Sequence, residues 1–286
     1  MSHPYTLDDL PRFSPWPARL LGLEPWEPKC KTAQEVTREY EVEKWGPLLA
    51  KVRQAQQPIS LAQVDEWHLG NLPPALCSIN GQLDMLPPQE AHQQYLNIIE
   101  GVLKQYLPTS ALIELGAGYG SIILGLAETE SFRQTRLLAG EYTASGMELI
   151  HTLAKAQSLA IETAYCDFAW PTVTELSIPA GAILFTSFAT HYVPKLSPDF
   201  INQLTQFQPR IVAHFEPCYE HCDSTTLLGL MRRRYIEVND YNRNLATLLY
   251  EQQQQGRIKI LEERPAVFGT NSLLAASIIV WQPNLL

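Results

Sequence analysis

The chain lacks a hydrophobic run that could cross a membrane. Its most apolar late stretch, residues 272–281, falls well short of the ~20 residues that a transmembrane helix needs. The first residues contain neither the basic nor the apolar segment of a signal peptide. We therefore expect a cytoplasmic protein with no membrane partner.

Positive charge is also scarce. The 286 residues include 21 Lys and Arg against 30 Asp and Glu, which gives a net charge of -9. A protein that binds the phosphate backbone needs a basic face, so no nucleic-acid partner is expected. The length permits one sizeable core and one or two domains, and it leaves the oligomeric state open.

Cysteines are few and odd in number, five in all, which fits reduced thiols better than a disulfide framework. Four residues of zinc-ligand type lie close together: His214, Cys218, His221 and Cys222. Their spacing is compressed and no second ligand pair follows at a distance, so we expect no metal.

The first 86 residues predict a helical cap over the rest of the chain. Residues 32–52 have an apolar stripe at helical spacing (Ala33, Val36, Tyr40), and Gly46-Pro47 is expected to break this helix in two. Residues 59–84 are expected to hold one short helix and turns. The helix expected over 87–106 opens the second region, 87–286.

Beyond Pro108, apolar strands alternate with helices. This alternation predicts a parallel sheet with helices on both faces. The end of the chain differs, with a long helical stretch over 224–254 followed by an antiparallel hairpin. The fold class is therefore α/β: a Rossmann-like, seven-stranded, mostly parallel sheet with a C-terminal antiparallel hairpin and an N-terminal helical cap. The expected strands are 111–115, 137–142, 161–165, 182–187, 210–215, 257–267 and 272–281.

A glycine-rich turn, Gly116-Ala117-Gly118-Tyr119-Gly120, follows Glu114 between a strand and a helix. Glycines let the backbone approach a ligand where a Cβ would collide. Dinucleotide sites place their third glycine one residue later, where Ser121 stands here. Acids follow the next two strands, in Glu141-Tyr142 and Asp167-Phe168. A carboxylate after the second strand can accept the hydroxyls of a ribose.

With these motifs in this order, residues 87–281 resemble the class I S-adenosylmethionine-dependent methyltransferases. The resemblance implies S-adenosylmethionine as the cofactor. It implies that Gly116, Ala117, Gly118 and Gly120 line the methionine moiety, with Glu114 near its amino group. It also implies ribose binding at Glu141 and Tyr142, adenine binding at Asp167 and Phe168, and a position for Ser187 near the sulfonium.

Methyl transfer needs an aligned nucleophile, and a general base helps where the nucleophile carries a proton. His191 follows the fourth strand and could act as this base. Glu216 closes the fifth strand and could orient or deprotonate an N–H group, and Tyr219 follows it. Tyr241 lies in the basic, aromatic stretch 232–244, which is either a solvated helix face or a lid. With His191, Glu216 and Tyr219, it completes our set of catalytic candidates.

We therefore predict a methyltransferase that acts at N or O of a natural product or a peptide. Side-chain amide N-methylation of a ribosomal peptide is one version of this function. Two other classes stay open: a non-catalytic binding module that retains the fold, and an NAD(P)-dependent reductase.

Overall fold

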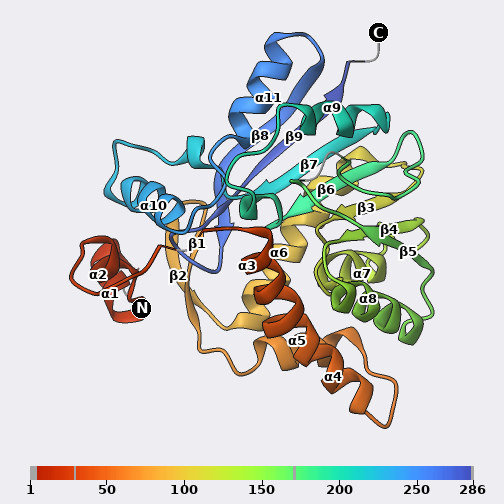
Figure 1. Ribbon diagram of the computed structural model, residues 1–286, viewed down its shortest axis with the longest axis horizontal. Coiled ribbons are helices and arrows are strands. Elements are labelled where there is room, and N and C mark those ends of the chain that lie inside the picture. Colours follow the sequence, from red (N-terminus) through yellow and green to blue (C-terminus); the bar gives the residue numbers. More distant parts are fainter. Residues whose placement is uncertain (1–4, 29, 170–171, 285–286) are drawn as a thin grey trace.

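The computed structural model describes residues 5–28, 30–169 and 172–284. Within these ranges, nine strands form one sheet in the order β2-β1-β8-β9-β7-β6-β3-β4-β5 (Figure 1). The strands are β1 (Ala75–Ile79), β2 (Gln82–Leu86), β3 (Leu112–Leu115), β4 (Leu137–Glu141), β5 (Ile161–Tyr165), β6 (Ile183–Ser187), β7 (Ile211–Glu216), β8 (Ile258–Gly269) and β9 (Ala276–Pro283).

Strands β3 to β7 pair in parallel, and β9 pairs antiparallel with both β7 and β8. All seven expected strands are thus present, and the predicted Rossmann-like α/β class is confirmed. Strands β3, β4, β6 and β7 are buried, because consecutive residues point into opposite helical layers, whereas the edge strand β5 is partly exposed. Leu112 and Ile113, for example, belong to different core clusters.

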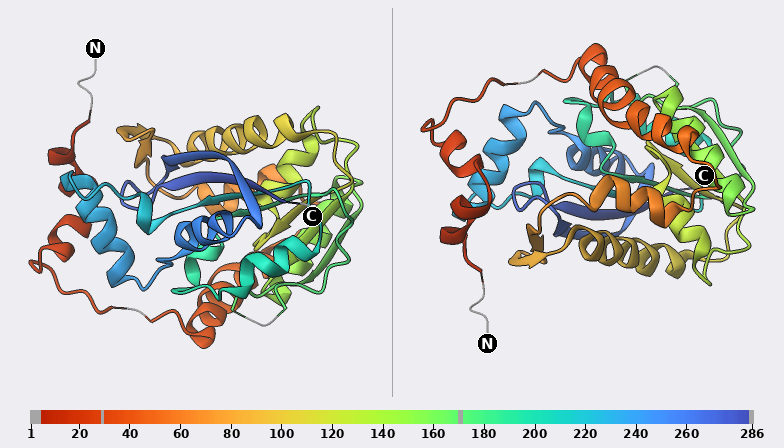
Figure 2. Two further views of the ribbon diagram at one scale, coloured as in Figure 1. Left: turned by 90° about the horizontal axis from the view of Figure 1, so that it is seen from above. Right: turned by 90° about the horizontal axis from the view of Figure 1, so that it is seen from below.

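Helices cover both faces of the sheet. Helices α4 to α8 pack on one face, while α9 and α11 pack on the other, as the edge-on views show for α6, α9 and α11 (Figure 2). The helices are α1 (Leu10–Phe13), α2 (Trp16–Leu20), α3 (Ala33–Thr37), α4 (Gly46–Gln54), α5 (Leu61–Leu69), α6 (Pro88–Leu103), α7 (Ser121–Glu128), α8 (Ala144–Ala156), α9 (Asp199–Gln206), α10 (Leu227–Val238) and α11 (Leu245–Gln254).

Strands β1 and β2 form a hairpin where turns alone were expected. Asn80 and Gly81 both have positive φ, of 49° and 81°, as a two-residue hairpin turn requires. The hairpin joins the sheet because Ser78 and Ile79 pair with Gly269 and Phe268 of β8. The region before residue 87 therefore contributes strands to the sheet as well as helices.

The expected break at Gly46-Pro47 is wrong. A π-helical segment, η2 (Arg38–Trp45), links α3 to α4 without interruption, and the Gly46 N–H donates to the carbonyl of Glu41. Proline clashes with the carbonyl four residues earlier in a regular helix, and the wider π turn relieves this clash.

The helical stretch expected over 224–254 is present as two helices, α10 and α11. The chain leaves α10 through Asp240, which has a φ of 50°, and starts α11 only at Leu245. The Asn242 side chain accepts hydrogen bonds from the N–H groups of Asn244 and Leu245 at 3.0 and 2.9 Å, which begins the new helix. No helix in the described part of the chain is long and apolar enough to span a membrane.

Candidate active site

A cavity of about 750 Å³ opens where the parallel strands β3 to β6 end. This is the edge at which open α/β sheets bind ligands, and the volume lies within the usual range for small-molecule sites. The predicted site residues that line it are Glu114, Gly116, Ala117, Gly118, Tyr142, Asp167, Phe168, Ser187, His191 and Tyr241. Gly120, Glu141, Glu216 and Tyr219 lie outside its lining.

The glycine turn forms one wall of the cavity. Gly116 has a φ of +81°, and a Cβ built on it would lie 2.4 Å from the Cβ of Ala189. The N–H groups of Gly116 and Ala117 donate to the carbonyl of Gly140, at 2.8 and 3.0 Å, and so hold the turn against β4. Gly120 instead caps the start of α7 and packs toward Ile150.

Glu114 is a buried carboxyl group at the cavity wall. One of its oxygens, Oε2, accepts from the N–H of Ile123 at 3.0 Å. Burial raises the pKa of Glu114 well above its ordinary value, and the nearby carboxylates of Glu141 and Glu216 raise it further. A cationic ligand would stabilise the ionised form of Glu114, so the wall favours an ammonium group.

Glu141 lies behind the glycine turn. Its Oε2 accepts from the N–H of Gly118 at 2.8 Å, and its Oε1 accepts from the N–H and the hydroxyl of Thr143 at 3.0 and 2.6 Å. Burial raises the pKa of Glu141, although these donors oppose the effect. A ribose contact would therefore have to replace one of these hydrogen bonds, whereas the adjacent Tyr142 faces the cavity directly.

The residues after β5 form the next part of the wall. The Asp167 carboxylate accepts from the N–H of Ala169 at 2.9 Å and from the hydroxyl of Tyr165 at 3.2 Å. The Phe168 ring lies against Gly116 and packs edge-to-face on Phe200, with the ring centroids 5.9 Å apart. A flat apolar surface and a carboxylate acceptor thus lie side by side, as an adenine would require.

Glu216 and His191 form a buried pair beside the cavity. Glu216 is fully buried and accepts from the N–H groups of Ala189, at 2.9 Å, and Thr190, at 3.1 Å. The Nδ1 atom of His191 lies 3.6 Å from Oε2 of Glu216. Burial opposes ionisation of Glu216, but His191 and the backbone amides lower its pKa. Burial lowers the pKa of His191, and the carboxylate of Glu216 opposes this shift.

Two tyrosines pack against the His191 ring. Its centroid lies 4.5 Å from that of Tyr192 and 4.9 Å from that of Tyr241. The loop that carries Tyr241 is held in place because the N–H of Asn242 donates to the carbonyl of His191 at 2.8 Å. Tyr219 lies elsewhere, with its hydroxyl donating to Glu237 of α10 at 2.9 Å.

The N-terminal helices supply much of the remaining wall of the cavity. The sequence predicted a cap here but did not indicate which of its residues face the cavity. The apolar stripe of Ala33, Val36 and Tyr40 faces the cavity. The ring of Trp45 lies close to the glycine turn. A Cβ built on Gly118 would lie 3.1 Å from this ring. Lys31 and Lys44 complete this wall. Tyr40 and Trp45 are five residues apart. A π turn brings residues at this spacing to one face, whereas the apolar pattern of a regular α-helix does not predict it.

A polar cluster closes the cavity beside α5 and α6. Asp65 accepts from the hydroxyls of Tyr119 and Ser121 at 2.8 and 2.9 Å, and the Ser121 hydroxyl lies 3.0 Å from Nε2 of His92. Burial lowers the pKa values of His68 and His92. No motif in the sequence indicated that these residues meet.

The four residues of zinc-ligand type do not converge. Within the described ranges, no group of three or more His, Cys, Asp or Glu residues is placed to hold a metal ion. The two nitrogens of His214 interact with Thr186 and Trp281, and His221 pairs with Glu263 at 2.7 Å.

The chain matches no protein-family model and no curated protein, but solved structures align with it. One is magnesium protoporphyrin IX methyltransferase from Synechocystis PCC 6803, with bound SAM, at 11% identity and a TM-score of 0.49 over 88% of this chain and 96% of that chain. A SAM-dependent methyltransferase from Clostridium acetobutylicum ATCC 824 matches at 8% identity and 0.46, over 67% and 91%. The plantazolicin methyltransferase BpumL matches at 10% identity and 0.44, over 67% and 84%.

The strand order itself defines the fold. Seven strands run β5-β4-β3-β6-β7-β9-β8, and β9 alone among these seven is reversed. This is the Rossmann-like arrangement of the class I S-adenosylmethionine-dependent methyltransferases.

Proposed function

We propose that this protein is a methyltransferase that uses S-adenosylmethionine to methylate an O–H or N–H group of a small natural product or a peptide side chain. The observation that carries this proposal is the position of the His191–Glu216 pair. It lies beside the same cavity that the glycine turn and the buried Glu114 line. A cofactor wall and a candidate base thus share one enclosed space.

The residues present fit the cofactor. Gly116, Ala117 and Gly118 would hold the methionine part, with its ammonium group against Glu114. Tyr142, Asp167 and Phe168 would hold the adenosine part, with Glu141 reaching the ribose after exchanging one of its present hydrogen bonds. When bound, the cofactor supplies an activated methyl group on a sulfonium.

The protein's own contribution is alignment and proton removal. His191 is neutral and buried, so its imidazole can take the proton of the acceptor. Glu216, fixed by two backbone amides, stabilises the imidazolium that results. The rings of Tyr192 and Tyr241 hold the imidazole in place and exclude water from it.

Calorimetry with adenosylhomocysteine, NAD+ and NADP+ tests the cofactor. We expect binding of adenosylhomocysteine alone, and nicotinamide binding without it would favour a reductase instead.

Intact-mass analysis then tests turnover on a panel of peptides, phenols and carboxylic acids, with a gain of one methyl group as the expected result. His191→Phe should retain adenosylhomocysteine binding and lose the methyl gain. Cofactor binding with no product from any acceptor would instead support a non-catalytic module.

A further inference from the structure

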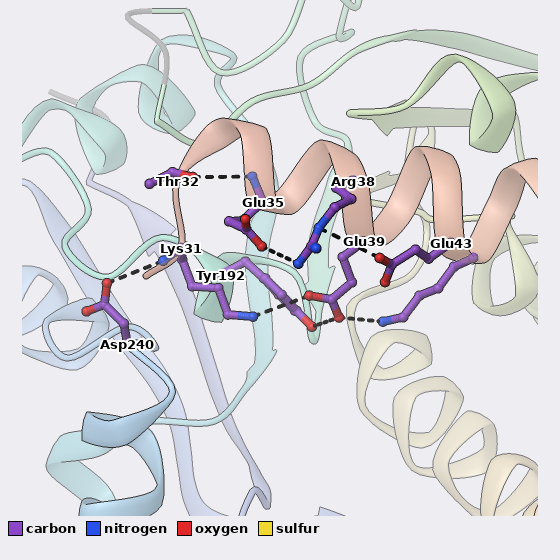
Figure 3. A network of polar contacts seen from close by, with 9 residues as sticks. Lys31, Thr32, Glu35, Arg38, Glu39, Glu43, Tyr192 and Asp240 are labelled. Atoms are coloured by element: carbon purple, nitrogen blue, oxygen red, sulfur yellow. Dashed lines mark hydrogen bonds and ion pairs between the residues drawn. The ribbon is translucent and has the colours of Figure 1, made fainter. Parts of the chain in front are cut away.

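Two lysines at the cavity converge on one carboxylate. The Nζ of Lys31 lies 3.3 Å from Oε2 of Glu39, and the Nζ of Lys44 lies 2.9 Å from Oε1. The hydroxyl of Tyr192 donates to Oε1 at 2.8 Å, and Figure 3 shows Lys31 and Tyr192 reaching Glu39. Burial opposes its ionisation, but Lys44, Lys31 and Tyr192 lower the pKa of Glu39 to about 2. These donors therefore form a ready-made carboxylate site.

Charge is divided between the two halves of the cavity. Two carboxylates line the cavity on its cofactor half. Glu114 belongs to β3, and Asp167 follows β5. The lining residues with a positive side chain are Lys31 and Lys44, on the N-terminal half. Glu39 balances the two ammonium groups without itself lining the cavity. A ligand on this half would therefore meet cations and hydroxyl donors first.

Aromatic rings surround these cations. The Nζ of Lys31 lies 4.3 Å from the ring centroid of Tyr192 and 5.1 Å from that of Tyr241, and the Nζ of Lys44 lies 4.1 Å from that of Tyr40. The first two tyrosines are the ones that contact His191. A ligand body packed against these rings from the cavity, which all three tyrosines line, would thus extend from the lysines to the candidate base.

We propose that the methyl acceptor carries a carboxylate on an aromatic body, and that Lys31 and Lys44 bind this carboxylate in place of Glu39. The inference rests on the methyl transfer proposed above. Glu39 is the more accessible member of this ion pair, since its side chain is 26% exposed while that of Lys31 is only 6% exposed. Rotation of Glu39 into solvent would leave both ammonium groups facing the incoming acid.

Benzoate and its neutral isostere benzamide test this site on the full chain saturated with adenosylhomocysteine. We expect benzoate to bind roughly tenfold more tightly than benzamide, because a charged acceptor strengthens each hydrogen bond. Lys31→Met should remove this preference, and Glu39→Gln should tighten benzoate binding. Lys51→Met is the matched control, since Lys51 covers Trp67 outside the cavity lining and should leave affinity unchanged.

A rescue experiment tests the carboxylate site without any cofactor. Glu39→Ala should lower the melting temperature, and acetate but not acetamide should restore it at saturation. The double variant with Lys31→Met should show no such rescue. Equal binding of benzoate and benzamide, or acetate rescue that persists in the double variant, would overturn the inference. Failure of the wild-type protein to bind adenosylhomocysteine would instead contradict the proposed function. The acetate rescue contains no cofactor, so its result is independent of that outcome.

Discussion

Replacing Gly116 by alanine should weaken cofactor binding as well as folding. A residue with a side chain at a φ of +81° costs about 1–2 kcal/mol. The new methyl group would also lie 2.4 Å from the Cβ of Ala189, whereas non-bonded carbons prefer about 3.5–4.0 Å. One of the two segments must therefore move by roughly 1 Å.

That movement reaches both halves of the proposed site. Ala189 donates its N–H to Glu216, so displacing it disturbs the carboxylate beside His191. Gly116 itself lines the cavity where the methionine part of the cofactor would lie. We expect the affinity for adenosylhomocysteine, measured by calorimetry, to fall at least about tenfold, which corresponds to ~1.4 kcal/mol.

Gly256→Ala provides the matched control. Gly256 also has a positive φ, of +71°, but no described atom lies within 4 Å of a Cβ built there. It should lose about 1–2 kcal/mol of unfolding free energy in urea and keep full affinity for adenosylhomocysteine. If the Gly116→Ala protein bound adenosylhomocysteine as tightly as the control does, the reasoning about this turn would be refuted.

Three further predictions concern the buried polar groups. Glu216→Gln should lower turnover about 10²–10⁴-fold while adenosylhomocysteine binding persists, as kinetics beside calorimetry would show. Glu114→Gln should become more stable relative to wild type as pH rises above 4.5. The pKa of Glu114 is raised on folding, so its carboxyl group binds more protons in the folded than in the unfolded protein. Ionisation of this group at higher pH therefore destabilises the wild-type protein, whereas glutamine does not ionise. Urea unfolding at pH 5 and pH 8 checks this, and a difference independent of pH would contradict it. Asn242→Ala leaves the N–H groups of Asn244 and Leu245 without their acceptor and should cost about 1–3 kcal/mol of unfolding free energy; an unchanged urea midpoint would count against it.

The sequence predicted the parallel part of the fold well, because its strands are short apolar runs separated by helices of clear period. The hairpin of β1 and β2 also carries a signal in the sequence. Asn80-Gly81 stands between two short runs that contain apolar residues, which is a strong indication of a two-residue hairpin turn. The division between α10 and α11 had a weaker signal, since Asn239 and Asp240 adopt the left-handed region only somewhat more readily than other residues.

Site residues could be predicted where they lie in one short segment after a strand. They could not be predicted where segments distant in sequence meet in space. The glycine turn, Asp167, Phe168 and His191 all follow strands and line the cavity as a group. Lys31 and Lys44 reach the same space from the N-terminal helices, and only tertiary packing brings them there. Tyr219 was predicted at the site because it is close to Glu216 along the chain. Its side chain lies outside the cavity lining and donates to Glu237 instead.

The β1–β2 hairpin has a consequence for how the protein could be trimmed. Ser78 and Ile79 pair with the rim of β8, and the Ser78 hydroxyl also receives a hydrogen bond from the buried guanidinium of Arg232 at 2.6 Å. Deleting the first 86 residues would remove the backbone pairing of Phe268 and Gly269 at the end of β8 and leave an arginine without one of its acceptors. Such an open rim is a template for self-association, so a shortened protein should aggregate rather than serve as a minimal catalytic unit.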